Sequence, residues 1–207
     1  MNYTKKLAAV ILVFAVVLGF TGCAAKMTRE AFISEIKAMG AEETDKLDVV
    51  LLSISRMGVD SLYYVAADEE DARDFGNLAL NRFNNMSDIK ADDFIAATIA
   101  EKGSDGKYYS TAILYYSFES DSKAEKTYKN ICDAYINDKY AKTGKNSSCS
   151  YSVEADVSAA GSNNIATGVY LQGNTVVFLM SKSAVGDGYK TADKFCKKFG
   201  FVSPSKV

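Results

Sequence analysis

Histidine is absent from the 207 residues of the chain. Because histidine is the usual general base of hydrolases and the commonest metal ligand, its absence removes both roles. The four cysteines include no Cys-x-x-Cys pair, which a zinc site built from cysteine alone would need. We therefore expect no catalytic residues, no metal site and no bound cofactor, and we expect that the protein is not an enzyme.

Basic residues are not in excess either. The chain has 24 Lys and Arg against 26 Asp and Glu, a net charge of −2. A protein that reads nucleic acid normally shows a basic patch or stripe, so the composition predicts no nucleic-acid partner. Pro204 is the single proline, and no proline-rich linker divides the chain. With 48% hydrophobic residues, the chain has ample material for the core of one domain.

The amino terminus carries the pattern of an export signal. Lys5 and Lys6 precede an uncharged, mostly apolar segment of residues 7–20. The next residues complete Phe20-Thr21-Gly22-Cys23, which resembles the lipobox of bacterial lipoprotein precursors, with Phe20 at a place that is usually leucine. The resemblance implies that residues 1–22 are removed and that Cys23 becomes the lipid-attachment residue, bearing diacylglycerol and hence palmitate.

An uncleaved membrane anchor is the alternative, because residues 7–25 carry no charge and approach the roughly 20 residues that a spanning helix needs. Either arrangement places the folded part outside the cytoplasm, at the cell membrane, and both the inner and the outer membrane fit the signal. We expect a signal peptide of residues 1–22, a lipidated tether of residues 23–27 and a single domain of residues 28–207. Cleavage removes two lysines and no acid, so the mature charge becomes −4.

Hydrophobic periodicity predicts the elements of this domain. Segments that alternate or are rich in aromatic and β-branched residues predict strands at 61–67, 93–101, 107–118, 149–158, 165–171 and 175–181. Apolar residues three and four apart predict helices at 28–39, 68–86, 122–136 and up to Gly200. Leu47–Met57 fits a helix or a buried strand, and we favour the helix. Residues 41–46 and 142–148 are expected to be loops.

The order of these elements predicts the fold class. Residues 61–158 run β-α-β-β-α-β, the order of a ferredoxin-like split unit, which a hairpin around Gly173-Asn174 and a C-terminal helix extend. We predict an α+β domain with an antiparallel sheet and helices packed on one face. Ser122 and Glu125 have the spacing of a capping box at the start of the third helix.

Three tyrosine pairs are the candidate binding residues. Tyr63-Tyr64, Tyr108-Tyr109 and Tyr115-Tyr116 lie in predicted strands, where neighbouring side chains point to opposite faces. One ring of each pair would then lie away from the helices and form a tyrosine-bearing sheet face for a protein or glycan ligand. The alternative is that loops, the tether or a second layer cover these rings.

Other motifs have plainer interpretations. The segments Ser120-x-x-Lys123, Lys142-Thr143-Gly144 and Ser162-Asn163-Asn164 have the motif shapes of penicillin-recognising serine enzymes. In that family the Ser-x-Asn element precedes Lys-Thr-Gly, whereas here it follows, and Ser120 suits a helix cap. The acidic run 68–74 lacks the glycine and the ligand spacing of a calcium loop and fits a helix start.

Three cysteines remain in the domain, Cys132, Cys149 and Cys196. They fit one disulfide with a thiol left over, or three small core residues.

The function that we expect is a membrane-anchored extracytoplasmic lipoprotein with a non-catalytic binding or accessory role in the bacterial cell envelope. A histidine-free envelope enzyme that uses Ser and Lys or paired carboxylates is one alternative. A structural subunit of a membrane assembly is the other.

Overall fold

The computed structural model describes residues 26–56, 62–84, 89–103, 106, 108–156, 164–183 and 189–207. The predictions for the signal peptide, for Cys23 and for Ser162-Asn163 lie outside these described residues. No helix within the described ranges is long and apolar enough to cross a membrane.

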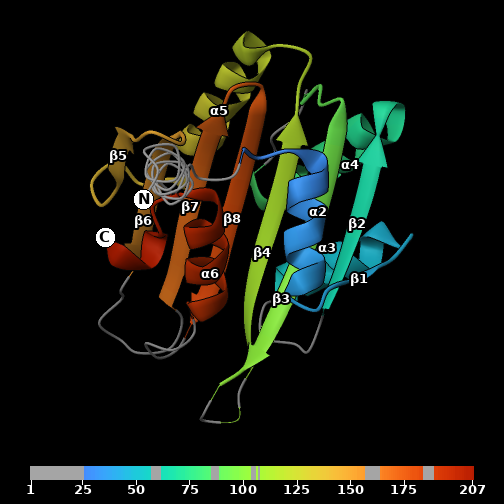
Figure 1. Ribbon diagram of the computed structural model, residues 1–207, viewed down its shortest axis with the longest axis horizontal. Coiled ribbons are helices and arrows are strands. Elements are labelled where there is room, and N and C mark those ends of the chain that lie inside the picture. The colour runs from blue at the N-terminus through green and yellow to red at the C-terminus, as the bar shows by residue number, and fades with distance from the viewer. Residues whose placement is uncertain are drawn as a thin grey trace, which may run out of the picture.

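Eight strands in the described part of the chain form one sheet, in the order β1-β2-β3-β4-β8-β7-β6-β5 (Figure 1). Neighbouring strands are antiparallel throughout, except that β1 and β2 are parallel. The strands are β1 (Glu42–Glu43), β2 (Leu62–Asp68), β3 (Asp93–Lys102), β4 (Tyr108–Ser117), β5 (Lys142–Lys145), β6 (Ser150–Asp156), β7 (Asn164–Gln172) and β8 (Thr175–Ser183).

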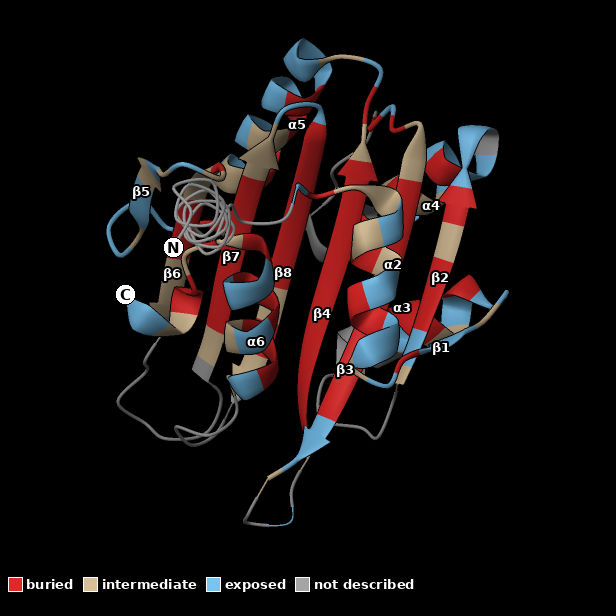
Figure 2. Cartoon of the chain, in the orientation of Figure 1, coloured by how far each residue is buried: buried red, intermediate tan, exposed pale blue. Residues whose placement is uncertain are grey.

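Helices cover both faces of this sheet. Helices α2 (Arg29–Ala38) and α6 (Lys190–Phe199) lie in front of it in Figure 1, and α3 (Leu47–Arg56), α4 (Glu69–Asn84) and α5 (Asp121–Tyr135) lie behind. The predicted α+β class is confirmed, and the prediction that helices pack on one face was wrong. Residues 94–100 of β3 are all buried (Figure 2), and such a run, apolar except for Thr98, is typical of a strand that is covered on both sides.

The sheet separates two hydrophobic cores. One core joins α3, α4 and α5 to the sheet side chains of Phe94, Leu114 and Tyr116. The other joins α2 and α6 to Tyr115 and Leu179. Neighbouring residues of one strand therefore enter different cores, as the pleat of a strand requires.

The predicted ferredoxin-like split unit was also wrong, although the order of its elements is as predicted. In a split unit another strand lies between the two strands that a helix connects. Here β2 and β3 are direct antiparallel neighbours, with Asp68 opposite Asp93. On the other side, β8 pairs with β4, with Thr175 opposite Ser117, and the hairpin of β8 and β7 lies between β4 and β6.

The sequence predicted the start of α2 and the helical state of α3 correctly, and the cap of α5 wrongly. Thr28 caps α2 by accepting a hydrogen bond from the amide of Ala31 at 3.2 Å. Residues 47–56 are helical, as favoured. The capping box at Ser122 was wrong, because α5 already begins at Asp121 and its cap is Ser120, whose backbone is extended.

The predicted turns at Gly173 and Gly200 are confirmed, whereas two predicted loops contain short strands. Gly173, with φ 58°, lies in the two-residue turn of the β7–β8 hairpin, as predicted. Gly200 ends α6 in the left-handed region, and the amide of Phe201 donates to the carbonyl of Cys196 at 2.8 Å. The predicted loops at 41–46 and 142–148 contain β1 and β5. Both are short strands at the edges of the sheet, where the neighbouring strand rather than the local sequence determines the pairing.

Candidate functional site

The residues of the Ser-x-x-Lys motif stabilise the start of α5. The hydroxyl of Ser120 accepts a hydrogen bond from the backbone amide of Lys123 at 3.4 Å. The ammonium group of Lys123 binds the carboxylate of Glu119 and lowers the pKa of that carboxyl. Lys142 of the Lys-Thr-Gly segment lies instead on β5, where it lines a different hollow.

The tyrosine pairs do not form an open face. Tyr64, Tyr109, Tyr115 and Tyr116 are buried, whereas Tyr63 is 38% exposed. The second layer is the reason: the ring of Phe32 on α2 packs against the ring of Tyr115 with their centroids 5.2 Å apart. The predicted tyrosine-bearing sheet face is therefore wrong for these buried rings.

Cys132, Cys149 and Cys196 are free thiols. Cys149 and Cys196 are buried in the core beneath α2 and α6, and burial raises the pKa of each thiol to about 12. Cys132 is partly buried on α5 on the other side of the sheet, and burial raises its pKa to about 11. Thiols with raised pKa values are poor nucleophiles at neutral pH, so these residues act as small core side chains.

A hollow of about 590 Å³ lies between α6, β5 and the C-terminal 3-10 turn η1 (Pro204–Lys206). This volume falls within the roughly 300–1,000 Å³ that is usual for sites that bind small molecules. We call it the C-terminal hollow. Its lining residues are Lys142, Asp193, Lys194, Cys196, Lys197, Phe201, Val202, Ser203 and Lys206.

Phe201, an apolar residue of the lining that is 7% exposed, is held in place by packing, and we call it the floor of the C-terminal hollow. The ring of Phe201 stacks on the ring of Tyr170, with centroids 4.4 Å apart and planes at 9°. The hydroxyl of fully buried Tyr170 donates to the carbonyl of Val202 at 2.8 Å. The side chain of Asn146, next to β5, donates to the carbonyl of Gly200 at 3.0 Å and ties the rim to the end of α6. These contacts fix Phe201 and the end of α6, so the hollow is a feature of the packed domain.

Four lysines give this hollow its charge. Lys142 comes from β5, Lys194 and Lys197 from α6, and Lys206 from η1, and all four are exposed. Within the part of the chain that the structure describes, none of them forms an ion pair. The carboxylate of Asp193, the acidic residue of the lining, already accepts hydrogen bonds from the hydroxyls of Ser203 and Ser205.

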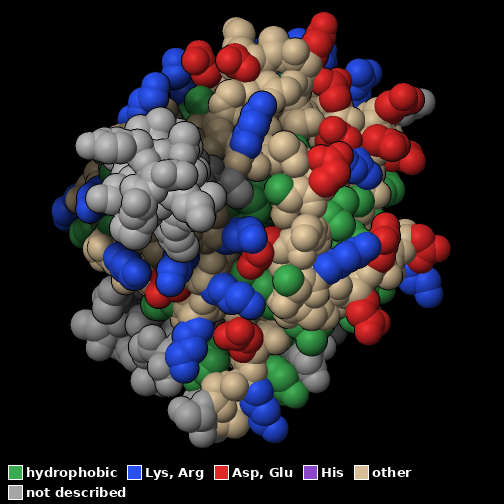
Figure 3. Space-filling view, viewed as in Figure 1, with side chains coloured by type: hydrophobic (Ala, Val, Ile, Leu, Met, Phe, Trp, Pro, Cys, Tyr) green, Lys and Arg blue, Asp and Glu red, His purple; other side chains and the backbone are tan. Residues whose placement is uncertain are grey.

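The surface charge is unevenly distributed around this region. In Figure 3, Lys and Arg side chains gather around α6, whereas Asp and Glu side chains concentrate at the upper right. The positive charge around α6 is opposite in sign to the net charge of −2 of the whole chain. An uneven field of this kind raises the local concentration of anions near α6.

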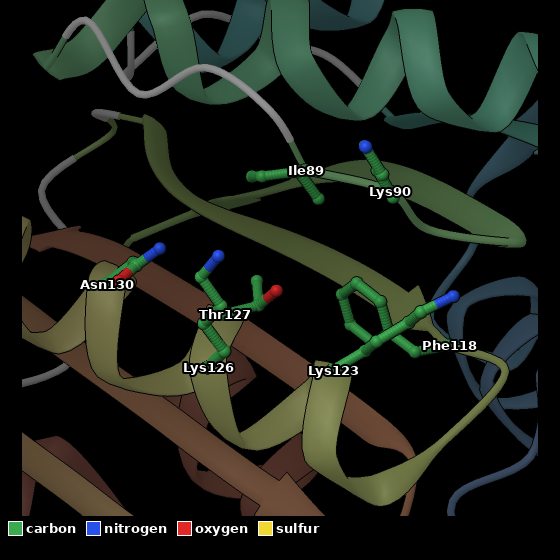
Figure 4. A pocket seen from close by; sticks show the side chains of 7 residues that line it. All are labelled: Ile89, Lys90, Phe118, Lys123, Lys126, Thr127 and Asn130. Carbon is green, nitrogen blue, oxygen red and sulfur yellow. The ribbon is translucent and has the colours of Figure 1, made fainter.

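A second, smaller pocket lies beside α5 (Figure 4). Its volume is about 260 Å³, and its lining combines the buried side chains of Ile89 and Phe118 with three lysines. Its cations are Lys90, Lys123 and Lys126, and Lys123 is already paired with Glu119. Because it is smaller and has a neutralised cation, we take the C-terminal hollow as the candidate site.

The sequence pattern does not reveal the C-terminal hollow. Lys197 lies in the last turn of a helix, where the negative end of the helix dipole is a sufficient reason for a cation. Lys142 and Lys206 lie far from it in the chain, and only the fold brings these residues together. Among the described residues, no cluster of Cys, Asp and Glu is arranged to hold a metal ion.

Comparisons with known proteins identify no family for this chain. No protein-family model matches the chain, and no curated protein matches its sequence. Among solved structures, the chain is similar to the extracellular domain of PknH from Mycobacterium tuberculosis, with a TM-score of 0.41 and 10% identity. The match covers 86% of this chain and 98% of that chain. A likeness of this size establishes neither a shared family nor a shared function.

Proposed function

We propose that the protein is a lipid-anchored, non-catalytic binding protein of the bacterial cell envelope, with its domain on the extracytoplasmic side of the membrane. The observation that carries this proposal is the lipobox-like segment Phe20-Thr21-Gly22-Cys23 after a cationic and then apolar segment. Diacylglycerol at Cys23 supplies two acyl chains, and two chains are enough for stable attachment.

The start of the domain supports a short tether. Met27 is buried, and its amide donates a hydrogen bond to the side-chain oxygen of Gln172 at 2.5 Å. Three residues lie between Cys23 and Met27, and the four residue steps of an extended chain span at most about 14 Å. A lipid at Cys23 would hold the start of α2 and the β7–β8 turn close to the membrane surface.

The C-terminal hollow supports a binding role. It has the volume of a ligand site, a rigid apolar floor and a rim of cations. Its acidic residue, Asp193, is occupied by two serine hydroxyls. This combination fits the capture of an anionic ligand better than acid–base chemistry, which needs a titratable group that is free to exchange a proton.

Metabolic labelling tests the anchor. Cells that express the full chain are grown with radiolabelled palmitate, and we expect label on the wild-type protein and none on Cys23→Ser. The matched control is Cys132→Ser, which removes a thiol of the domain and should keep the label. Label on Cys23→Ser, or an unlabelled full-length wild-type protein in the cytosol, would contradict the proposal.

A further inference from the structure

We propose that the C-terminal hollow binds a phosphate-bearing ligand, with the phosphate among the lysines and an apolar or ring group against Phe201. This proposal deepens the binding role described above and does not depend on the lipid anchor. The ligand that we propose is a doubly charged phosphate ester. A soluble molecule and a lipid headgroup can both carry this group.

The first support is the concentration of unpaired positive charge. Lys142, Lys194, Lys197 and Lys206 come from three elements and line one hollow. Like charges that share a surface repel one another, and a bound anion removes that repulsion. The contrast within α6 is informative, because Lys198, on the same helix, has its ammonium 3.7 Å from the carboxylate of Glu35. The fold neutralises that lysine and leaves those of the hollow without a protein partner in the described residues.

The second support is that the dipole at the end of a helix does not account for all four lysines of the hollow. The dipole of α6 favours cations in its last turn, which accounts for Lys197 and Lys198. Lys194 lies one turn earlier, Lys142 is on an edge strand and Lys206 is in η1. Their convergence is a property of the tertiary structure, and anion binding gives all four the same role.

The third support is the match between ligand and lining. A phosphate monoester carries nearly two negative charges at neutral pH and three strong acceptor oxygens, so several ammonium groups can bind it at once. Lysine is suited to this task as a mobile point charge with three donors. The exposed part of Phe201, which is 7% of the residue and is fixed by the stack on Tyr170, provides an apolar contact for the rest of the ligand.

Calorimetry on the full chain, purified from membranes in a non-ionic detergent, tests the site. The probes are inorganic phosphate and phenyl phosphate, and we expect phenyl phosphate to bind more tightly because its ring reaches Phe201. The double variant Lys194→Gln/Lys197→Gln should weaken binding of phenyl phosphate by at least about tenfold, since charged hydrogen bonds are lost. The matched control, Lys46→Gln/Lys129→Gln, removes two exposed lysines outside the hollow and should bind as the wild type does.

Calorimetry with water-soluble short-chain lipids distinguishes the two sources of phosphate, because the lipid at Cys23 would attach the full chain to any vesicle. Short-chain phosphatidylcholine is compared with short-chain phosphatidic acid. Binding to phenyl phosphate alone supports a soluble ligand, and lysine-dependent binding to phosphatidic acid supports a lipid headgroup. The proposal is overturned if neither phenyl phosphate nor phosphatidic acid binds. It is also overturned if the Lys194→Gln/Lys197→Gln variant binds these two probes as tightly as the control variant does. Palmitate labelling at Cys23 is unaffected by either result, so the anchor and the ligand site fail independently.

Discussion

The rings of Phe32 and Phe195 meet edge to face, with centroids 5.7 Å apart and planes at 74°. This contact joins α2, at the start of the domain, to α6, near its end, over the same face of the sheet. Both side chains are completely buried. The contact therefore links the segment that follows the proposed tether to the helix that provides two lysines of the C-terminal hollow.

Removing this contact should destabilise the domain. Phe195→Ala deletes a fully buried ring and leaves a cavity, so we expect the free energy of unfolding to fall by about 3–5 kcal/mol. Phe195→Leu keeps most of the apolar volume and should cost clearly less. Urea denaturation followed by circular dichroism measures both variants. A loss below about 1 kcal/mol for Phe195→Ala would show that α6 packs more loosely than the structure has it.

The cap of α5 can be tested by two serines that lie two residues apart. Ser120→Ala removes the hydroxyl that accepts from the amide of Lys123, and we expect a loss of about 1 kcal/mol in the free energy of unfolding. Ser122→Ala is the matched control, because Ser122 lies inside the helix and is exposed, and it should be nearly neutral. The reverse order of the two effects would restore Ser122 as the cap.

Gly168 is expected to tolerate no side chain. A Cβ atom at this position would lie 2.3 Å from the hydroxyl oxygen of Tyr170, whose ring is buried and supports Phe201. Gly168→Ala must therefore displace Tyr170, and we expect a loss of about 1–3 kcal/mol in stability. It should also weaken binding of phenyl phosphate, because the floor of the C-terminal hollow moves. Tyr170→Phe, which loses only the hydrogen bond to Val202, should cost about 1 kcal/mol and serves as the comparison. Wild-type stability of Gly168→Ala in urea would show that the strand can relax around the extra methyl group.

Alkaline pH should destabilise the protein through its buried thiols. In the unfolded chain a cysteine ionises near pH 8.5, whereas burial raises the pKa of Cys149 and of Cys196 to about 12 in the folded chain. Between these values the folded state keeps protons that the unfolded state has released, so rising pH favours unfolding. The stability is fully present below about pH 8.5 and falls by roughly 1.4 kcal/mol per pH unit for each thiol as the pH rises toward the folded pKa.

Urea midpoints at about pH 7, 9 and 10.5 measure this loss across the expected window. Tyr116 and Tyr170 also have pKa values raised well above the ordinary value by burial, so they add to the slope above about pH 10. Cys149→Ala/Cys196→Ala should reduce the slope between pH 9 and 10.5, whatever its stability at neutral pH. An unchanged slope in this variant would mean that the two thiols are not the groups that respond.

Features that depend on neighbours in the chain could be predicted from the sequence by itself. The hairpin at Gly173, the end of α6 at Gly200 and the cap at Thr28 follow from backbone preferences of one or a few adjacent residues. The helices follow from an apolar period of 3.6, and the long strands follow from alternation or from runs of aromatic and β-branched residues. The predicted export signal also depends on contiguous residues, namely the charge, the apolar length and the Gly-Cys pair, and it stays a prediction.

Only the tertiary structure decided which surfaces are covered and which side chains meet. Helices α2 and α6 lie at opposite ends of the chain, and they close the sheet face that we expected to be open. The run in β3, apolar except for Thr98, was the signal for this second layer, but the run does not say which helices supply it. The C-terminal hollow depends in the same way on lysines from β5, α6 and η1. The physical reason is that burial and charge clustering are set by packing between distant segments, whereas propensity and capping act within a turn or two of the backbone.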